Sequence, residues 1–434
     1  MAHSPSAADA KVVILGGGLT GISTAIHLKK PWVLFEKDAR LGGHARTDET
    51  RGFFFDKTGH WLHLRDAGIK ALIHELLPNQ LVPVERKARI FSHGALTRYP
   101  FQANLHGLPP EIVSECLLGF LRAQVEPTQK APANFEEFCL QKFGAGISKH
   151  FMIPYNHKLW GVHPREITSA WCSRFVPVPK LEDVVKGAVG DVPPELGYNI
   201  SFLYPKVGGI ETMTRALIGR MAGGQVHTSA PVEKIDPAAR TVTVGGEVTP
   251  WSSIVATLPL PEICRRLTEA PKEVEVAAAH LRCTPVRYLN VATKSSPRSD
   301  FHWIYVPEEK YPFYRVGIYT NAVPQMAPPG CGSLYVELSD RGPLPKVDSI
   351  LPDVAQALHA ARALNSPDDI LFAELKELTY AYVVFDDHYY SSVETITRYL
   401  ESHQIYPRGR YGSWIYNAME DCILAGREIA AKLS

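Results

Sequence analysis

A glycine-rich stretch near the N-terminus constrains the fold more than any other part of the chain. Within residues 11–43, KVVILGGGLTGISTAIHLKKPWVLFEKDARLGG, an apolar β-branched run, a G-x-G-x-x-G loop, a segment of helical spacing and a second apolar run follow one another. Gly16 permits the tight turn, Gly18 lets a pyrophosphate approach bare backbone, and Gly21 lets the helix pack close to the strand. The helix N-terminus then offers N–H groups to phosphates, so the stretch predicts a βαβ dinucleotide-binding unit.

The residues that follow this unit distinguish between dinucleotides. Glu36 ends the second apolar run, at the position where an acidic side chain accepts hydrogen bonds from ribose hydroxyls and disfavours the extra phosphate of NADP. Gly42 and Gly43 come six and seven residues later, and this spacing resembles the E-x5-G-G continuation of glutathione-reductase-type FAD proteins, such as amine oxidases and sugar mutases. A second close approach of backbone to cofactor needs residues without Cβ, so the pattern favours FAD over NAD.

Composition excludes several classes of protein. A chain of 434 residues suits two or three domains, and a net charge of +1 argues against a broad surface for nucleic acid or anionic lipid. The seven cysteines include no C-x-x-C pair, which predicts free thiols, a reducing compartment and no metal site. No signal-peptide pattern and no apolar run of about 18 residues is present, so we expect a cytoplasmic protein without a membrane span.

The remaining patterns predict an α/β chain. We expect helices at residues 69–77, 350–364 and 393–402, a hairpin at 89–104, a mostly helical block at 108–144, and an aromatic segment of poor periodicity at 151–171. Strand-like runs occupy 226–255, and four further runs predict a second sheet: 286–293, 303–306, 314–320 and 333–338. The last unit, 406–433, is expected to be a strand, a loop and a helix whose positive N-terminus closes over the flavin.

Five blocks along the chain resemble one family, the FAD-dependent UDP-galactopyranose mutases, and more the eukaryotic type than the short bacterial type. The blocks are YPFQAN at 99–104, FMIPYNHKLW at 151–160, WIY at 303–305, PFYR at 312–315 and RGRYGSWIY at 408–416. They come in the family's order and cover nearly the whole chain.

The resemblance implies a glutathione-reductase-type FAD-binding Rossmann domain with an inserted helical domain and a second mixed or antiparallel sheet. We expect the FAD-binding domain to comprise residues 1–98, 201–280 and 396–434. The helical insertion would span 99–200, and a substrate-binding sheet domain would span 281–395.

The implied activity is the interconversion of pyranose and furanose forms of a nucleotide sugar, most simply UDP-galactose, to or from UDP-galactofuranose. In this family the sugar forms a covalent adduct with N5 of reduced FAD, without net redox change. The implied partners are a UDP-hexose substrate, a flavin reductant such as NAD(P)H, and further copies of the chain in a homo-oligomer.

The resemblance also assigns site residues. Catalytic roles fall to His60, Arg174 and Arg315, and Arg315 is expected to present a bidentate fork to the diphosphate. The implied substrate-binding residues are Tyr99, Gln102, Asn156, Trp160, Asn199, Tyr305, Arg315, Tyr389 and Tyr416. The implied cofactor-binding residues are Gly16, Gly18, Thr20, Gly21, Glu36, Gly42, Gly43, His44, Gly59, His60, Gly208, Val232, Arg410, Tyr416 and Asn417.

One departure from the family affects the diphosphate site. Phe175 stands where the family has a second arginine, and Arg174 lies one residue earlier, which on a strand would turn its side chain to the other face. Two alternatives therefore stay open, an FAD-dependent oxidase or dehydrogenase of the amine oxidase or protoporphyrinogen oxidase type, and a non-catalytic flavoprotein. Under the mutase hypothesis, Arg315→Ala is expected to leave an intact, flavin-loaded protein with weakened nucleotide binding.

Overall fold

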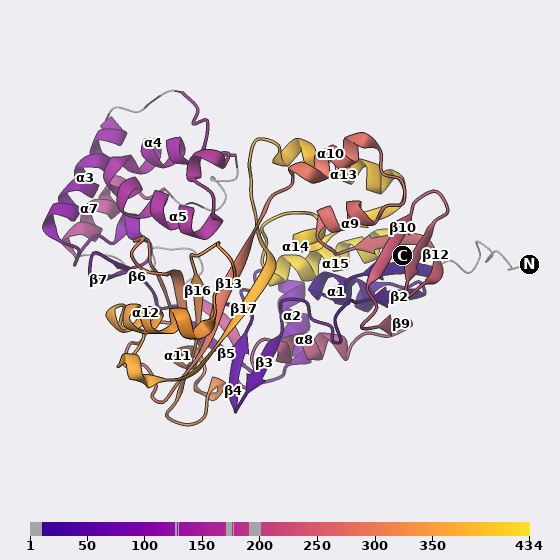
Figure 1. Ribbon diagram of the computed structural model, residues 1–434, viewed down its shortest axis with the longest axis horizontal. Coiled ribbons are helices and arrows are strands. Elements are labelled where there is room, and N and C mark those ends of the chain that lie inside the picture. The colour runs from indigo at the N-terminus through magenta and orange to yellow at the C-terminus, as the bar shows by residue number, and fades with distance from the viewer. Residues whose placement is uncertain (1–10, 126–127, 129, 171–175, 177, 191–200) are drawn as a thin grey trace, which may run out of the picture.

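The chain forms two large sheets, with a block of helices above the second sheet (Figure 1). The computed structural model describes residues 11–125, 128, 130–170, 176, 178–190 and 201–434. The expected α/β architecture, a nucleotide-binding sheet with a helical block and a second sheet, is confirmed.

The first sheet contains the predicted βαβ unit. β1 lies between β2 and β12 and is parallel to both, while β10 and β11 extend the sheet as an antiparallel ribbon. Its strands are β1 (Lys11–Leu15), β2 (Trp32–Phe35), β9 (Gly224–His227), β10 (Val232–Asp236), β11 (Thr241–Val244), β12 (Glu247–Ala256) and β18 (Ile405–Pro407). The strand expected near residue 406 therefore pairs with this sheet, beside β12.

The second sheet is mostly antiparallel, with one parallel pair between β14 and β6. In spatial order its strands are β17 (Ile370–Val383), β13 (Cys283–Thr293), β16 (Gly332–Leu338), β15 (Phe313–Ile318), β14 (Trp303–Tyr305), β6 (Ala88–Ser92) and β7 (Ala95–Arg98). All four predicted strands occur here, but β17 was not predicted. The β6–β7 hairpin also belongs to this sheet, whereas the expected boundary at residue 98 assigned it to the FAD-binding domain.

Helices cover both sheets. Those around the first sheet are α1 (Leu19–His27), α2 (Ala67–Leu76), α8 (Glu211–Ile218), α9 (Leu260–Arg266), α10 (Lys272–His280), α13 (Tyr389–Ser402), α14 (Gly409–Gly412) and α15 (Met419–Leu433). The second sheet carries α11 (Tyr319–Ala322) and α12 (Val347–Ala360), and the helical block contains α3 (Pro110–Val125), α4 (Phe135–Ile147), α5 (Ile153–Trp160) and α7 (Leu181–Val189). Two small ribbons, β3 (Thr47–Thr50) with β4 (Phe53–Asp56) and β5 (Leu81–Glu85) with β8 (Ser201–Pro205), complete the structure.

The expectation of a non-periodic segment at residues 151–171 is wrong for its first half. A π-helical turn at Ser148–Met152 leads into α5, which ends at Gly161 in the left-handed conformation. Tyr155 and Trp160 are buried, and so are the polar Asn156 and Lys158. A helix that buries polar as well as apolar side chains shows no clean apolar stripe, which explains why the pattern did not reveal it.

The two faces of the second sheet differ in chemistry because side chains alternate along each strand. One face is apolar and packs on α12, with Leu289, Val316 and Val336 in a common cluster with Leu358. The opposite face carries a row of polar side chains, which the register of the strands places next to one another. Tyr305 pairs with Arg315, Arg315 pairs with Glu337, and Glu337 pairs with Tyr288 on β14, β15, β16 and β13.

Candidate active site

The glycine loop after β1 has the shape that a pyrophosphate requires. Added Cβ atoms on Gly16 and Gly21 would collide with Thr257 and with the carbonyl of Gly16, so both positions need glycine for packing. An added Cβ on Gly18 would meet nothing within 4 Å. The chain thus keeps bare backbone at the N-terminus of α1 where packing alone would tolerate a side chain, which fits a bound phosphate.

Glu36 and the glycine pair close this loop. The Glu36 carboxylate accepts a hydrogen bond from the Gly17 N–H at 2.6 Å and another from the Asp38 N–H at 2.9 Å. The Gly42 N–H donates to the Gly17 carbonyl at 2.7 Å, and a Cβ on Gly43 would lie 3.1 Å from the Gly18 Cα. The two glycine motifs of the sequence therefore lie against each other.

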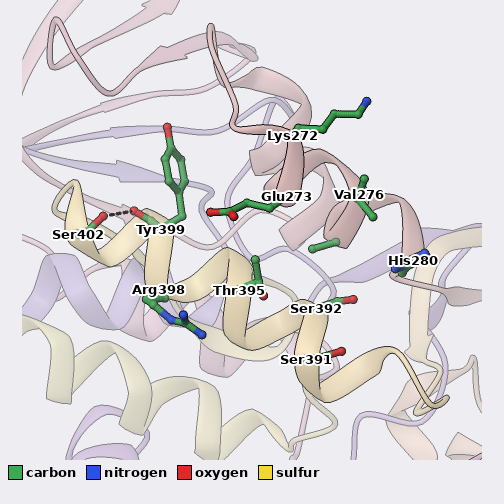
Figure 2. Close-up of a pocket in the computed structure, with 11 residues that line it drawn as sticks. Lys272, Glu273, Val276, His280, Ser391, Ser392, Thr395, Arg398, Tyr399 and Ser402 are labelled. Carbon is green, nitrogen blue, oxygen red and sulfur yellow. Dashed lines mark hydrogen bonds between the residues drawn. The ribbon is translucent and has the colours of Figure 1, made fainter.

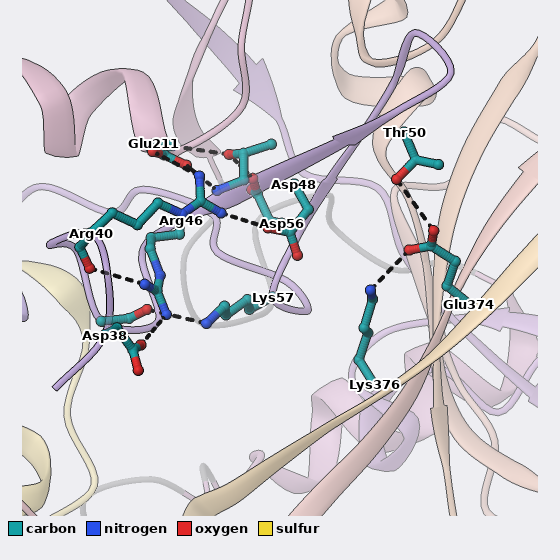
Figure 3. A network of polar contacts seen from close by, with 12 residues as sticks. Asp38, Arg40, Arg46, Asp48, Thr50, Asp56, Lys57, Glu211, Glu374 and Lys376 are labelled. Carbon is teal, nitrogen blue, oxygen red and sulfur yellow. Dashed lines mark hydrogen bonds and ion pairs between the residues drawn. The ribbon is translucent and has the colours of Figure 1, made fainter. Parts of the chain in front are cut away.

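Charged side chains lie near the glycine pair, and Figure 3 shows Asp38, Arg46 and Lys57 side by side. Arg46 pairs with Asp38 at 2.6 Å and donates to the Arg40 carbonyl, while its buried Nε has no hydrogen-bond partner among the described residues. Lys57 lies with its Nζ 3.5 Å from the Gly43 carbonyl, and burial, together with the charge of Arg46, lowers its pKa to about 8. Two cations beside the backbone cradle suit a diphosphate.

Arg315 and Glu337 form a buried ion pair at the centre of the second sheet's polar face. Arg315 Nε and Nη2 donate to the two Glu337 oxygens at 2.9 and 2.5 Å, and Nη2 also donates to the Tyr382 hydroxyl at 3.2 Å. The expected bidentate fork for a phosphate is therefore occupied by Glu337, whose side chain is fully buried. The Arg315 side chain is 20% exposed, and within the described chain its Nη1 N–H groups have no acceptor.

Tyrosines line the space beside Arg315. Tyr305 contacts the rings of Tyr99 and Tyr155 with centroids 5.3 Å apart in both cases, and Tyr382 lies parallel to Tyr416 at 6.1 Å. Burial raises the pKa of Tyr99, Tyr305 and Tyr382, so these phenols stay protonated and can donate hydrogen bonds at neutral pH. The expected residues Tyr99, Tyr305 and Tyr416 thus lie in one cluster with Arg315.

The C-terminal segment joins this cluster to the first sheet. Arg410 lies over the Tyr416 ring at 4.6 Å and donates to the Asn417 carbonyl at 2.6 Å. The Tyr411 hydroxyl hydrogen-bonds His44 at 3.1 Å. Thr20 on α1 donates to the Cys422 carbonyl on α15 at 3.0 Å. Two expected cofactor residues of the N-terminal part, Thr20 and His44, therefore contact the C-terminal segment that carries Arg410, Tyr416 and Asn417.

His60 lies between the two parts of the site. Burial lowers its pKa to about 4, and the charges of Arg410 and Arg315 act in the same direction. Its buried Nδ1 has no hydrogen-bond partner among the described residues, and neither atom of the Asn290 amide has one. Gly59 beside it packs so closely on Tyr335 that a Cβ would collide with the hydroxyl. A buried polar atom without a partner on His60, in a segment that packs on the second sheet through Gly59 and Tyr335, fits a polar cofactor such as FAD.

The depressed pKa of His60 predicts acid sensitivity. His60 takes up its proton only near pH 4 in the folded state and near 6.5 in the unfolded chain. The unfolded chain therefore binds more protons between these values, and the free energy of unfolding falls as the pH falls from 6.5 to 4. Urea denaturation at pH 7.5, 6 and 5 is expected to show this loss, and His60→Gln to reduce it. An equal loss in both proteins would exclude His60 as the source.

Tyr389, which was expected to bind substrate, makes different contacts. The Tyr389 hydroxyl donates to the Trp414 carbonyl at 2.5 Å, and its ring is buried against Phe385, so Tyr389 does not enter the cluster around Arg315. Tyr382 on β17, which sequence reasoning missed, bonds Arg315 instead. The alternation of Leu378, Tyr380 and Tyr382 was the available signal for this strand.

The remaining expected residues are placed as follows. The Asn156 amide bonds the Met152 carbonyl and accepts from Trp160, whose ring meets Tyr382 edge to face at 5.6 Å. Gln102 is buried. The Val232 carbonyl accepts from Arg266, and a Cβ on Gly208 would contact only Thr212. Arg174, Phe175 and Asn199 lie outside the described residues.

A groove of about 670 Å³ between α10 and α13 is separate from this site (Figure 2). Lys272 and His280 line it from α10, and Ser391, Arg398 and Tyr399 line it from α13. Of the expected site residues that the structure describes, none borders it. In the described part of the chain no cluster of three or more metal-ligating side chains occurs, and no described helix is long and apolar enough to cross a membrane.

Comparison with known proteins assigns the family. The family model for flavin-containing amine oxidoreductases matches residues 19–433, so the chain belongs to this family of flavin-dependent enzymes and its cofactor is FAD. A crystal structure of reduced UDP-galactopyranose mutase is 26% identical, with a TM-score of 0.91 over 98% of this chain and 95% of the other.

Two further solved structures share the fold. A putative protoporphyrinogen oxidase from Exiguobacterium sp. 255-15 is 15% identical with a TM-score of 0.76, over 98% of both chains. A putrescine oxidase bound to putrescine is 15% identical with a TM-score of 0.65, again over 98% of both chains. These two establish the architecture alone.

Proposed function

We propose that the protein is a nucleotide-sugar mutase that interconverts pyranose and furanose forms of an NDP-hexose, most simply UDP-galactose, on reduced FAD. The observation that carries the proposal is the cluster of Arg315, Tyr305, Tyr382 and Tyr416, which lies against the His60 loop of the cofactor site. The high structural similarity to a UDP-galactopyranose mutase supports it.

In this proposal the cluster holds a diphosphate. The Nη1 N–H groups of Arg315 and the phenolic O–H groups of Tyr305 and Tyr382 can donate hydrogen bonds, and such donors stabilise an oxygen that gains negative charge as a bond to it breaks. The Glu337 carboxylate holds the guanidinium in one orientation, so that its free edge stays directed into the cluster. Reduced FAD, when bound, supplies a nucleophilic ring nitrogen.

The domain roles follow from this arrangement. The first sheet would bind FAD, the second sheet would supply Arg315 and its tyrosines, and the helical block would add Tyr155 and Trp160 on α5. An external reductant such as NAD(P)H would be needed to bring the flavin to its active state.

Two tyrosines provide a matched test of which phenol faces the nucleotide. Tyr382→Phe removes a hydroxyl at Arg315 and is expected to weaken UDP binding about tenfold, with little change in stability. Tyr389→Phe leaves the Trp414 carbonyl without its donor and is expected to cost about 1 kcal/mol of stability, with UDP affinity unchanged. Calorimetric titration of both variants measures UDP affinity, and urea denaturation measures their stability. Weaker UDP binding in Tyr389→Phe, with normal binding in Tyr382→Phe, would show that Tyr389 and not Tyr382 contacts the nucleotide.

The family also supports a second candidate, an amine oxidase or dehydrogenase. A cationic amine would meet the charge of Arg315, which disfavours it. Titration of the FAD-loaded protein with UDP and with putrescine separates the candidates. UDP binding without flavin reduction by the amine supports the mutase, whereas anaerobic flavin bleaching by putrescine without UDP binding would establish the oxidase.

A further inference from the structure

Lys158 on α5 has an unusual environment for a lysine. Its side chain is buried, and its ammonium donates to four backbone carbonyl oxygens, those of Val306, Glu308, Tyr311 and Phe313, at 3.1, 2.8, 3.1 and 2.7 Å. An ammonium has three N–H donors, so four acceptors saturate it. A buried charge is tolerated only with such compensation.

All four carbonyls belong to one short segment. Residues 306–313 connect the end of β14 to the start of β15, and they curl around the ammonium as a carbonyl cage. The ladder pair nearest this connection is Tyr305 with Arg315. The path of the connection therefore determines the backbone positions of Tyr305 and Arg315, from which the two side chains extend.

The helix that carries Lys158 is itself anchored. Arg341 donates to the Lys158 carbonyl at 2.9 Å, and Thr284 donates to the Trp160 carbonyl, so the end of α5 is tied to the second sheet. Tyr155, one turn earlier, packs on Tyr305 and Tyr314. The helix that presents the ammonium to the 306–313 connection is thus held in place on the second sheet.

We propose that Lys158 is a positioning residue for the nucleotide site. Its ammonium binds the carbonyls of the 306–313 connection. It thereby keeps Tyr305 paired with Arg315 and holds both side chains at the position on the sheet that the diphosphate requires. The identity of the ligand as a diphosphate rests on the proposed function, whereas the effect of Lys158 on the order of the connection does not.

The chemistry of the cage explains why the residue is a lysine. A neutral side chain of similar length would fill the space but remove the ammonium donors from the four carbonyls, of which that of Glu308 would keep the Tyr311 N–H at 3.3 Å. Each buried carbonyl left without a donor costs about 1–3 kcal/mol unless the connection moves toward water. Burial lowers the pKa of Lys158 to about 7, while the four carbonyl dipoles favour the charged form. Movement of residues 306–313 is the expected response to loss of the ammonium.

The first test compares Lys158→Met with Lys310→Met by amide hydrogen exchange and UDP titration of the FAD-loaded proteins. Lys310 is a matched control, since it lies in the same connection, is 62% exposed, and has its ammonium paired with the Glu308 side chain and over the Tyr311 ring. We expect faster exchange at residues 303–318, unchanged exchange at 11–43 and at least about tenfold weaker UDP binding in Lys158→Met alone. Exchange and affinity like the wild type would overturn the proposal.

The second test is chemical rescue, which a purely space-filling role would not show. In Lys158→Ala, methylammonium chloride is expected to restore UDP affinity and slow exchange at residues 303–318, whereas tetramethylammonium chloride at equal ionic strength, which has no N–H donor, is not. Equal effects of the two salts would contradict the proposal, as would loss of FAD together with UDP in both Lys158 variants. If the wild type fails to bind UDP, the proposed function falls, and the exchange and its rescue alone decide the role of Lys158.

Discussion

Arg315→Ala is expected to lower the free energy of unfolding by about 3–5 kcal/mol and to abolish measurable UDP binding. The substitution leaves the fully buried Glu337 carboxylate without its counter-ion, and an uncompensated buried charge has a cost of this size. This prediction differs from the expectation from sequence, which left the variant intact. Urea denaturation of the purified variant measures the loss, and stability like the wild type would show that water reaches Glu337.

A double variant separates stability from binding. Arg315→Met with Glu337→Leu removes both charges, and replacing a buried ion pair by apolar side chains is often neutral for stability. We expect near wild-type stability with UDP binding weakened about tenfold to a hundredfold or more, because a charge-assisted hydrogen bond is worth about 1.5–3 kcal/mol. A double variant that binds UDP normally would remove Arg315 from the diphosphate site.

Gly18→Val is expected to give a colourless protein of nearly normal stability. Gly18 has φ −75° and ψ −178°, which valine adopts readily, and an added Cβ meets no protein atom within 4 Å. The side chain would instead enter the open space beside Gly18, where we expect the FAD pyrophosphate to bind. We expect the FAD dissociation constant to rise about a hundredfold or more, measured by flavin fluorescence on reconstitution of the apoprotein.

Gly21→Ala is the matched control for this prediction. Its Cβ would collide with the Gly16 carbonyl, so we expect it to lower the stability of the apoprotein itself. If Gly18→Val keeps its FAD, the cofactor does not approach the backbone at this glycine.

The βαβ unit could be predicted from sequence because the requirements for it are local. Turn geometry and close backbone approach require glycine at fixed spacing, and the structure confirms a βαβ unit in which Gly17 is hydrogen-bonded to both Glu36 and Gly42. The second sheet was also accessible, since its strands show apolar runs of the right length.

The cluster around Arg315 could not be predicted in the same way. Glu337 meets Arg315 only through the register of β16 on β15, which no spacing along the chain reveals. β17 contains Ala, Glu, Leu and Lys, which favour helix, so its tertiary pairing decided its structure and Tyr382 was missed. Tyr389 lies in a segment that resembles a family motif and was therefore expected to bind substrate. Its hydroxyl instead donates a hydrogen bond to the Trp414 carbonyl.

The most direct test of the mutase proposal is turnover by the reduced protein. FAD-loaded protein, reduced with dithionite under nitrogen, is mixed with UDP-galactofuranose, and the nucleotide sugars are separated by chromatography. Formation of UDP-galactopyranose by the reduced protein, and not by the oxidised protein, is the predicted result. Absence of conversion together with absence of UDP binding would contradict the proposal and favour a flavin oxidase.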